Sequence, residues 1–524
     1  MMRKLAATIC SALLLSPGWL GGTGFTLFAG LVPLLWISDS YDASRRSWWR
    51  VFGWALLAFV LWNAATIWWI WLATPVGPFA ATIASSFLNM VAFMLYHTVS
   101  KKGPKALAYT LLVSGWIATE YWYSIGDFSW PWLLLGNGFS HEIWAVQWYE
   151  YTGIFGGTLW VLLGNIFLYE AWRRGRDRRA WLRAAGVIVL PLLVSLAIFF
   201  SYRTPDEGSI EVSVVQPNIH DKFASGTAEE QEELLLSLTA QVPQGVDFIV
   251  LPETAIPYYR YDEESVRSAR PVRAFERLMR LKYPQALLVA GANTAVYYPD
   301  EAHPETARRD FNRRDGRSYY DAFNSALAID SSGVTAIHHK GRLVIGVENT
   351  PTWIFKALKF LVIDLGGTVG QLGIGEAGPV FRNRGTAVGP AICYEGLYGD
   401  FFGQFVRDGA QAMLISSNDC WWGDTPGHRH LFSIARLRAV EHRRAIARSA
   451  NTGTSGFIDT RGDVRQKLGW DRRGILTDTM ELNSRLTFYT RYGDYLGRIA
   501  QLLMGLCLLY YLAYRIKKKN HLIE

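Results

Sequence analysis

Three residues in the second half of the chain carry groups suited to nucleophilic catalysis: a thiol, a carboxylate and an amine. Cys393 follows the apolar run 388–392, a pattern typical of a strand that ends in a sharp turn and exposes a nucleophile. Glu253 ends an apolar run of its own, and Lys340 follows two histidines. A thiolate attacks acyl groups, a carboxylate accepts protons, and an ammonium group stabilises an oxyanion.

Each of these residues also has an ordinary structural interpretation. A lone thiol such as Cys393 is more often a buried packing residue than a nucleophile. An acid at a strand end such as Glu253 is as often part of a loop salt bridge as a base. Lys340 taken alone reads as a surface lysine. None of the three identifies a catalytic site by itself.

The composition indicates a membrane protein. Of the 524 residues, 50% are hydrophobic and 14% aromatic, and only 19% are charged, against about 25% in soluble domains. This balance excludes a disordered or collagen-like protein, and four cysteines are too few for a disulfide scaffold. The net charge of +8 does not indicate nucleic-acid binding, because the basic residues flank apolar segments.

Eight apolar segments are long enough to cross a bilayer as helices. They predict a membrane domain with seven helices over 1–202, a separate domain over 203–485, and a last helix with a basic tail over 486–524. The first segment resembles a signal peptide, but the second follows within three residues, which favours an uncleaved helix. The predicted segments are 5–21, 24–39, 50–73, 78–99, 105–124, 152–171, 184–202 and 494–514.

Lysines and arginines mark alternate loops between these segments. They occupy the loops 40–50, 100–105 and 173–183, whereas the intervening loops contain neither residue. Because basic loops stay on the cytoplasmic side, this pattern predicts that both termini are cytoplasmic and that residues 203–485 lie outside. In a bacterium that side is the periplasm or the cell exterior.

Residues 203–485 read as an α/β domain, because short β-branched runs alternate with helical patterns. Ligand sites in such domains gather at the carboxyl ends of strands, where Glu253, Cys393 and Asn418 stand. The predicted strands are 210–215, 248–251, 286–290, 387–392 and 412–415, and the predicted helices are 228–241, 264–282 and 430–447.

The order of the three motifs resembles the nitrilase superfamily, whose catalytic set is one Glu, one Lys and one Cys in that sequence. The motifs are Leu251-Pro252-Glu253, Lys340 before Leu343-Val344, and Ile392-Cys393-Tyr394-Glu395. With the eight-helix frame, the chain resembles the bacterial apolipoprotein N-acyltransferase family over nearly its whole length. Further matching motifs are Glu120, Phe128-Ser129-Trp130-Pro131-Trp132, Gln216-Pro217-Asn218, Asn324-Ser325, Ser417-Asn418-Asp419 and Arg448-Ser449-Ala450-Asn451.

The resemblance implies an αββα sandwich that moves a fatty acyl group from a phospholipid to the N-terminal amine of a diacylglyceryl-cysteine lipoprotein. It assigns Cys393 as the nucleophile that forms a thioester, Glu253 as the general base and acid, and Lys340 as the oxyanion stabiliser. Glu348, Tyr394 and Glu395 are implied supports. No cofactor or metal is expected, and we expect a monomer that meets the lipid bilayer, phospholipid and apolipoprotein, without nucleic acid.

Two other functions use the same residues. A membrane-tethered amidase or nitrilase would pass the acyl group to water, although eight helices are an excessive anchor for a soluble substrate. A non-enzymatic lipid or export component would keep an inactive domain, although the complete Glu, Lys and Cys set argues against decay. Incubation with phospholipid and a diacylated lipopeptide separates the three by transfer, hydrolysis or no reaction.

The stretch 352–363 is apolar but too short to span a bilayer, and its length suits an interfacial segment. Lys356 and Lys359 share one helical face, which predicts a membrane-dipping arm that guides acyl chains toward Cys393. The alternative is an amphipathic helix packed on the domain core. The substrate-binding residues predicted here are Trp353, Phe355, Leu358 and Leu361, with Asn418 from the strand end.

Overall fold

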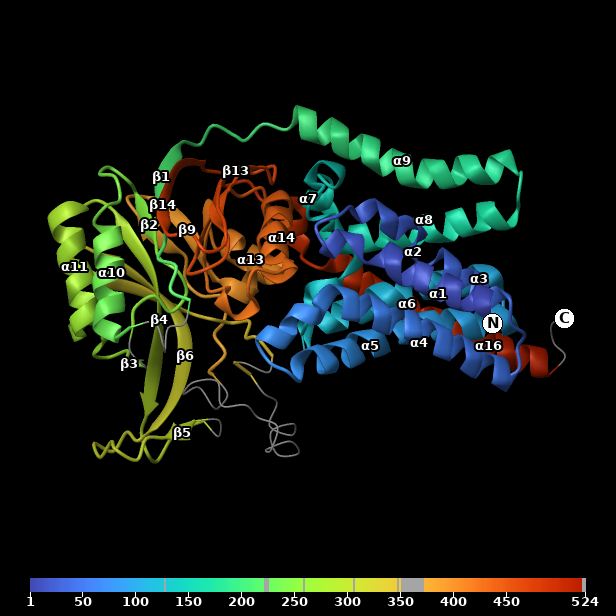
Figure 1. The fold of residues 1–524 in the computed structure, drawn as a ribbon, viewed down its shortest axis with the longest axis horizontal. Helices are drawn as coiled ribbons and strands as arrows, with labels where there is room; N and C mark the ends of the chain where they lie inside the picture. Colours follow the sequence, from blue (N-terminus) through green and yellow to red (C-terminus); the bar gives the residue numbers. More distant parts are fainter. Residues whose placement is uncertain are drawn as a thin grey trace. The chain divides into compact units, whose positions relative to one another are not determined.

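The computed structural model describes residues 1–126, 129–220, 226–257, 260–304, 307–345, 348–349 and 372–520. The chain divides into two compact units (Figure 1). One unit consists of Met1–Tyr202 together with Tyr492–Glu524, and the other consists of Arg203–Arg491.

The first unit is helical, and its helices are predominantly apolar. Among the described residues, five segments are long and apolar enough to cross a membrane: Arg45–Leu72, Gly77–Lys102, Ile154–Arg173, Arg178–Ser201 and Tyr495–Lys519. The α-helices of this unit are α1 (Met2–Leu15), α2 (Leu27–Gly30), α3 (Val32–Asp39), α4 (Arg45–Ile67), α5 (Gly77–Lys102), α6 (Lys105–Ile125), α7 (Tyr149–Thr152), α8 (Ile154–Arg173), α9 (Arg178–Ser201) and α16 (Tyr495–Lys519).

Three of the eight predicted spans do not meet this criterion of length and apolarity. The bounds 5–21 are wrong, because α1 stops at Leu15 and Pro17 opens a separate 3₁₀ turn. The segment Gly24–Asp39 forms a shorter apolar helix. Helix α6 has 21 residues but is not among the five segments that meet the criterion. The count of eight transmembrane helices therefore stays a prediction.

A buried carboxylate fixes the chain inside this unit. Glu120 of α6 is 5% exposed, and a carboxylate in such a place needs hydrogen-bond donors. It accepts hydrogen bonds from the Leu135 backbone N–H at 2.9 Å, the Thr158 hydroxyl at 2.6 Å and the Trp116 indole at 3.1 Å. Glu120 thus ties α6 to α8 and to the irregular segment between them.

The second unit contains two β-sheets, which confirms the α/β class predicted for this segment (Figure 1). In the first sheet, β1, β2 and β4 run parallel, and β14 pairs antiparallel with β1 at one edge. In the second sheet, β9, β10 and β11 run parallel. The first sheet comprises β1 (Ser209–Gln216), β2 (Phe248–Val250), β3 (Tyr261–Asp262), β4 (Leu287–Tyr298), β5 (Arg308–Arg309), β6 (Tyr319–Asp330), β7 (Gly333–His339) and β14 (Gly474–Glu481); the second comprises β8 (Phe381–Asn383), β9 (Thr386–Ile392), β10 (Ala412–Ser417), β11 (Ile446–Ala450), β12 (Ser455–Ile458) and β13 (Val464–Leu468).

The two sheets face each other and are joined by side-chain hydrogen bonds. The Ser449 hydroxyl on β11 donates to the Val215 carbonyl on β1 at 2.7 Å, and the Ser416 hydroxyl on β10 donates to the Leu251 carbonyl at 2.9 Å. Helices α10 (Ala228–Thr239) and α11 (Arg270–Lys282) pack their apolar faces on the first sheet. Helices α13 (Gly399–Arg407) and α14 (Pro426–His442) accompany the second sheet, so the layers follow an αββα order (Figure 1).

Two predicted helices differ from the observed ones at their ends. Helix α11 begins at Arg270 rather than 264, and the intervening residues form a turn and a short 3₁₀ helix. Helix α14 ends at His442, because Arg443 adopts a left-handed conformation with φ of 51° that closes the helix. The predicted helix 430–447 therefore runs wrongly into strand β11.

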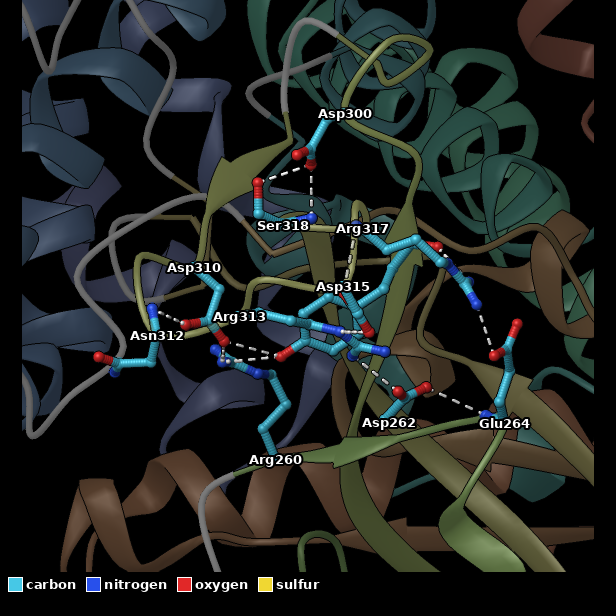
Figure 2. A network of polar contacts seen from close by, with 11 residues as sticks. Arg260, Asp262, Glu264, Asp300, Asp310, Asn312, Arg313, Asp315, Arg317 and Ser318 are labelled. Carbon is cyan, nitrogen blue, oxygen red and sulfur yellow. Dashed lines mark hydrogen bonds and ion pairs between the residues drawn. The ribbon is translucent and has the colours of Figure 1, made fainter.

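The long hairpin formed by β4 and β6 carries a network of ion pairs at its outer end (Figure 2). Arg313 pairs with Asp262 and with Asp315, each at 2.8 Å, and Arg317 pairs with Glu264 at 2.5 Å. These contacts tie the described part of the connection between β4 and β6 to β3 and to the turn that follows β3.

Candidate active site

The carboxyl ends of the parallel strands from both sheets meet at one edge of the sandwich. Glu253 lies just beyond β2, and its backbone N–H donates to the Ser417 carbonyl at the end of β10 at 3.4 Å. Cys393 lies just beyond β9, the parallel neighbour of β10, where Ile392 pairs in register with Ser416. The two sequence motifs that were predicted to converge are therefore brought together by the facing sheets.

The backbone is strained at these strand ends. Asn218, Thr254 and Cys393 all have positive φ values, of 55°, 48° and 47°, in the turns that follow β1, β2 and β9. This left-handed conformation costs free energy for a residue with a Cβ, most of all for a β-branched one. Three strained turns at one edge indicate that the surrounding packing holds these side chains in fixed positions.

Lys340 lies in a buried cluster with two carboxylates. It directly follows β7, and its Nζ donates to Glu253 Oε1 at 2.7 Å and to Glu348 Oε1 at 2.9 Å. Asn324 of β6 completes the cluster, because its Nδ2 donates to the same two carboxylate oxygens at 2.7 and 3.0 Å. One ammonium and one amide thus hold Glu253 and Glu348 side by side.

The Lys340 side chain is 1% exposed, so its charge depends on these partners. Burial alone would lower the pKa of Lys340, but the negative charges of Glu253 and Glu348 outweigh it and raise the pKa well above its ordinary value. Lys340 is therefore a permanent cation at neutral pH. The alternative interpretation of Lys340 as a surface lysine is therefore wrong.

The Cys393 thiol is buried, and it is a free cysteine. Burial raises the pKa of Cys393 most, the charge of Glu253 raises it further, and the charge of Lys340 lowers it. The pKa lies far above neutrality, so the resting side chain is a thiol. Attack on an acyl group consequently requires a nearby proton acceptor, and Glu253 is the carboxylate that acts most strongly on the thiol.

Glu395 connects the turn of Cys393 with the turn of Lys340. Its carboxylate accepts hydrogen bonds from the backbone N–H of Ile392 and from that of Gly341, each at 2.6 Å. His338 Nε2 lies 3.1 Å from the same carboxylate. The residue before the thiol and the residue after the lysine are thus held by one fully buried side chain.

Tyr394 is fully buried, and its ring contacts that of Tyr398 at a centroid distance of 5.4 Å. Asn418 is 5% exposed, and its Oδ1 accepts a hydrogen bond from Asn451 Nδ2 at 3.1 Å. Asn418 therefore supports neighbouring turns in this structure.

The whole predicted arm 352–363 lies outside the described residues. This includes the predicted substrate-binding residues Trp353, Phe355, Leu358 and Leu361.

Asn324 and the pair Asp419 and Arg448 belong to motifs noted in the sequence, but the sequence analysis gave them no role at the site. Asn324 lies on the long strand β6, which the strand predictions did not include. Asp419 forms a buried ion pair with Arg448 at 2.8 Å, and Arg448 also donates to the Ser417 hydroxyl at 2.8 Å. The spacing within the chain gives no signal that Arg448 and Asp419 pair, because 29 residues separate them.

Among the described residues, no group of three or more His, Cys, Asp or Glu side chains is arranged to hold a metal ion. What the described arrangement offers is a buried thiol, a carboxylate beside it, and a permanent cation hydrogen-bonded to that carboxylate. These groups suit nucleophilic acyl chemistry.

Comparison with known proteins places the chain in a family. Residues 211–486 match the family model described as Carbon-nitrogen hydrolase, which defines the class of the α/β unit. A second model, described as Apolipoprotein N-acyltransferase N-terminal domain, matches residues 11–167. The chain belongs to the apolipoprotein N-acyltransferase family.

Individual relatives cover nearly the whole chain. The apolipoprotein N-acyltransferase of Chlorobaculum tepidum is 30% identical over 489 residues, which is 88% of this chain and 87% of that protein. The one of Geobacter metallireducens is 25% identical over 515 residues, 94% of this chain and 93% of that protein. Among solved structures, the nitrilase-superfamily protein Nit3 of Saccharomyces cerevisiae is 18% identical and covers 52% of this chain and 90% of its own, with a TM-score of 0.36, a likeness too low to bear on function.

Proposed function

We propose that this protein transfers a fatty acyl group from a phospholipid to the N-terminal amine of diacylglyceryl-cysteine lipoproteins through a thioester at Cys393. The observation that carries the proposal is the buried cluster in which Lys340 Nζ lies 2.7 Å from Glu253 Oε1, with the charges of both residues acting on the Cys393 thiol. The names of the relatives supply the acceptor, since they are apolipoprotein N-acyltransferases.

In the first half-reaction, Glu253 accepts the thiol proton while Cys393 Sγ attacks the ester carbonyl of the phospholipid. The carbonyl oxygen becomes an oxyanion, and Lys340 stabilises its charge in a water-poor site. The C–O bond of the ester then breaks, the proton moves from Glu253 to the leaving alkoxide, and the lysophospholipid departs. The acyl group remains on Cys393 as a thioester.

In the second half-reaction, the lipoprotein amine attacks the thioester carbonyl and gives its proton to Glu253. The C–S bond breaks, the thiolate recovers the proton from Glu253, and the product is an amide. Because donor and acceptor use one site in turn, the kinetics should be ping-pong.

Glu348 keeps a negative charge beside Lys340 throughout this mechanism. When Glu253 takes a proton, Lys340 loses the charge of its partner at 2.7 Å but keeps that of Glu348 at 2.9 Å. A buried ammonium without any partner would be costly, so the second carboxylate lowers the cost of protonating the first. Tyr394 and Glu395 support the same turn by packing and hydrogen bonding.

An assay with both substrates tests the proposal. Purified protein should convert a diacylated lipopeptide to the N-acylated form when phospholipid is present, and lysophospholipid should appear in equal amount. Mass spectrometry of the lipopeptide measures the transfer. Release of free fatty acid without transfer would show a hydrolase instead, and the absence of any reaction would show an inactive domain.

We also propose that eight helices cross the bacterial inner membrane, with both termini in the cytoplasm and the α/β unit in the periplasm. The support is the five apolar helices and the confinement of Lys and Arg to alternate loops.

Accessibility labelling tests this topology in cells. Cysteines introduced at Arg46, Lys102 and Arg176 should react with a membrane-impermeant maleimide only after the cytoplasm is opened. A cysteine introduced at Glu301, on the outer part of the β4–β6 hairpin, should react in intact spheroplasts. Labelling of any of the three basic loops from outside would contradict the proposed orientation.

A further inference from the structure

Arg342 is a cation near the site that has no anionic partner among the described residues. It lies two residues after Lys340, is partly buried, and its guanidinium lies over the rings of Tyr398 and Phe401, at 5.1 and 5.3 Å from the centroids. Its Nε is buried and has no hydrogen-bond partner among the described residues. By contrast, the buried Arg448 of the same domain pairs with a carboxylate at 2.8 Å.

The position of Arg342 is fixed from both sides. Gly341 has no room for a side chain, because a Cβ there would lie 2.6 Å from the Gly375 carbonyl oxygen and 2.7 Å from the Phe401 ring. The Gly341 N–H is also held by Glu395. The Tyr398 ring that supports the guanidinium contacts the ring of Tyr394, the residue after Cys393. Arg342 is therefore anchored between the turn of Lys340 and the turn of Cys393.

The charge balance gives this cation a function. Glu253 and Glu348 both pair with a single ammonium group, that of Lys340, so this cluster carries an excess of negative charge and repels an anion. A phospholipid donor carries a phosphodiester anion close to the ester that must reach Cys393. A guanidinium held flat on aromatic rings recognises phosphate oxygens with two parallel hydrogen bonds and is more weakly hydrated than an ammonium.

We propose that Arg342 binds the phosphate of the lipid donor. This inference rests on the proposed function, because it requires that a phospholipid enters the site. The lipoprotein acceptor has no phosphate in its diacylglyceryl-cysteine group, so Arg342 serves only the first half-reaction.

The test compares a phospholipid with a neutral donor. Arg342→Met keeps an apolar stem on the two rings but removes the charge, and it should raise the KM for phosphatidylglycerol in mixed micelles by about 10- to 100-fold, the value of one charge-assisted bidentate contact. Because ground state and transition state lose the contact equally, kcat at saturating donor should change little. Acylation of Cys393 by p-nitrophenyl octanoate, which has no phosphate, should be unaffected. Arg342→Lys should restore part of the loss.

Arg309→Met is the matched control. Arg309 also lies over aromatic rings, those of Phe311 and Tyr319 at 5.6 and 5.8 Å, but it belongs to β5 on the projecting hairpin. The same substitution there should leave the KM for phosphatidylglycerol unchanged.

Several outcomes would overturn the assignment. An equal loss with both donors would make Arg342 a packing residue, and no loss with phosphatidylglycerol would remove it from the site. If inorganic phosphate slowed the neutral-ester reaction of the wild type but not of Arg342→Met, while the KM for phosphatidylglycerol was the same in both, the arginine would bind free phosphate rather than a lipid. Failure of the wild-type protein to form a thioester with either donor would instead contradict the proposed function itself.

Discussion

Replacing Cys393 by alanine is expected to abolish both thioester formation and acyl transfer. In the proposed mechanism, the Cys393 thiol attacks the lipid ester in the first half-reaction and carries the acyl group into the second, so neither half-reaction can proceed without it. Cys393→Ser should also be nearly inactive, because a hydroxyl needs a stronger base than a carboxylate to become a nucleophile. The measurements are lipopeptide acylation and lysophospholipid release by purified protein.

Cys420 provides the control for this prediction. It lies on the neighbouring turn that follows β10 and is partly exposed. Cys420→Ala should keep most of the activity, so loss of one thiol near the site is not enough to stop transfer. If Cys393→Ala were fully active, or if Cys420→Ala folded normally but were inactive, the assignment of Cys393 as the nucleophile would be wrong.

Glu253→Gln is expected to slow acylation by at least about 10²-fold, because the amide keeps the shape but cannot accept the thiol proton. Lys340→Met removes the charge and keeps the stem, and the loss of oxyanion stabilisation should cost about 10²–10³-fold. Pre-steady-state formation of the thioester from phospholipid measures both effects directly, since it isolates the first half-reaction.

Glu263→Gln is a suitable control for both variants. The Glu263 carboxylate is partly buried and lies 2.7 Å from His339 Nε2, at the end of β7. It has no contact with Lys340 in the cluster described above. Its replacement should leave acylation near the wild-type rate. If Glu253→Gln or Lys340→Met also transferred at a near wild-type rate, the role proposed for that residue would be wrong.

The sequence predicts the parts of this protein that depend on local patterns. The β-branched runs before Glu253 and Cys393 form strands β2 and β9, and the capping residues Thr227 and Glu230 begin α10 where a helix was predicted. Because parallel strands end at one edge of a sheet, both residues could be placed at a common site before the structure was known.

The remaining features depend on contacts between distant residues. The β4–β6 hairpin joins strands of 12 residues each, but only the first part of β4 has the apolar run of a buried strand. Asn324 and Glu348 join Glu253 only after β6 and β7 bring them there. The ends of α1 and α14 are an exception with a local cause, because a proline and a left-handed residue end these helices although the apolar pattern continues.

The central claim is a covalent intermediate on Cys393, and mass spectrometry of the protein after exposure to phospholipid alone tests it most directly. With no acceptor present, the thioester has no amine to react with and should accumulate. The account predicts that the peptide containing Cys393 gains the mass of one fatty acyl group, and that adding a diacylated lipopeptide removes it. An acyl group on Cys420, or transfer to lipopeptide without any acyl-enzyme, would contradict it.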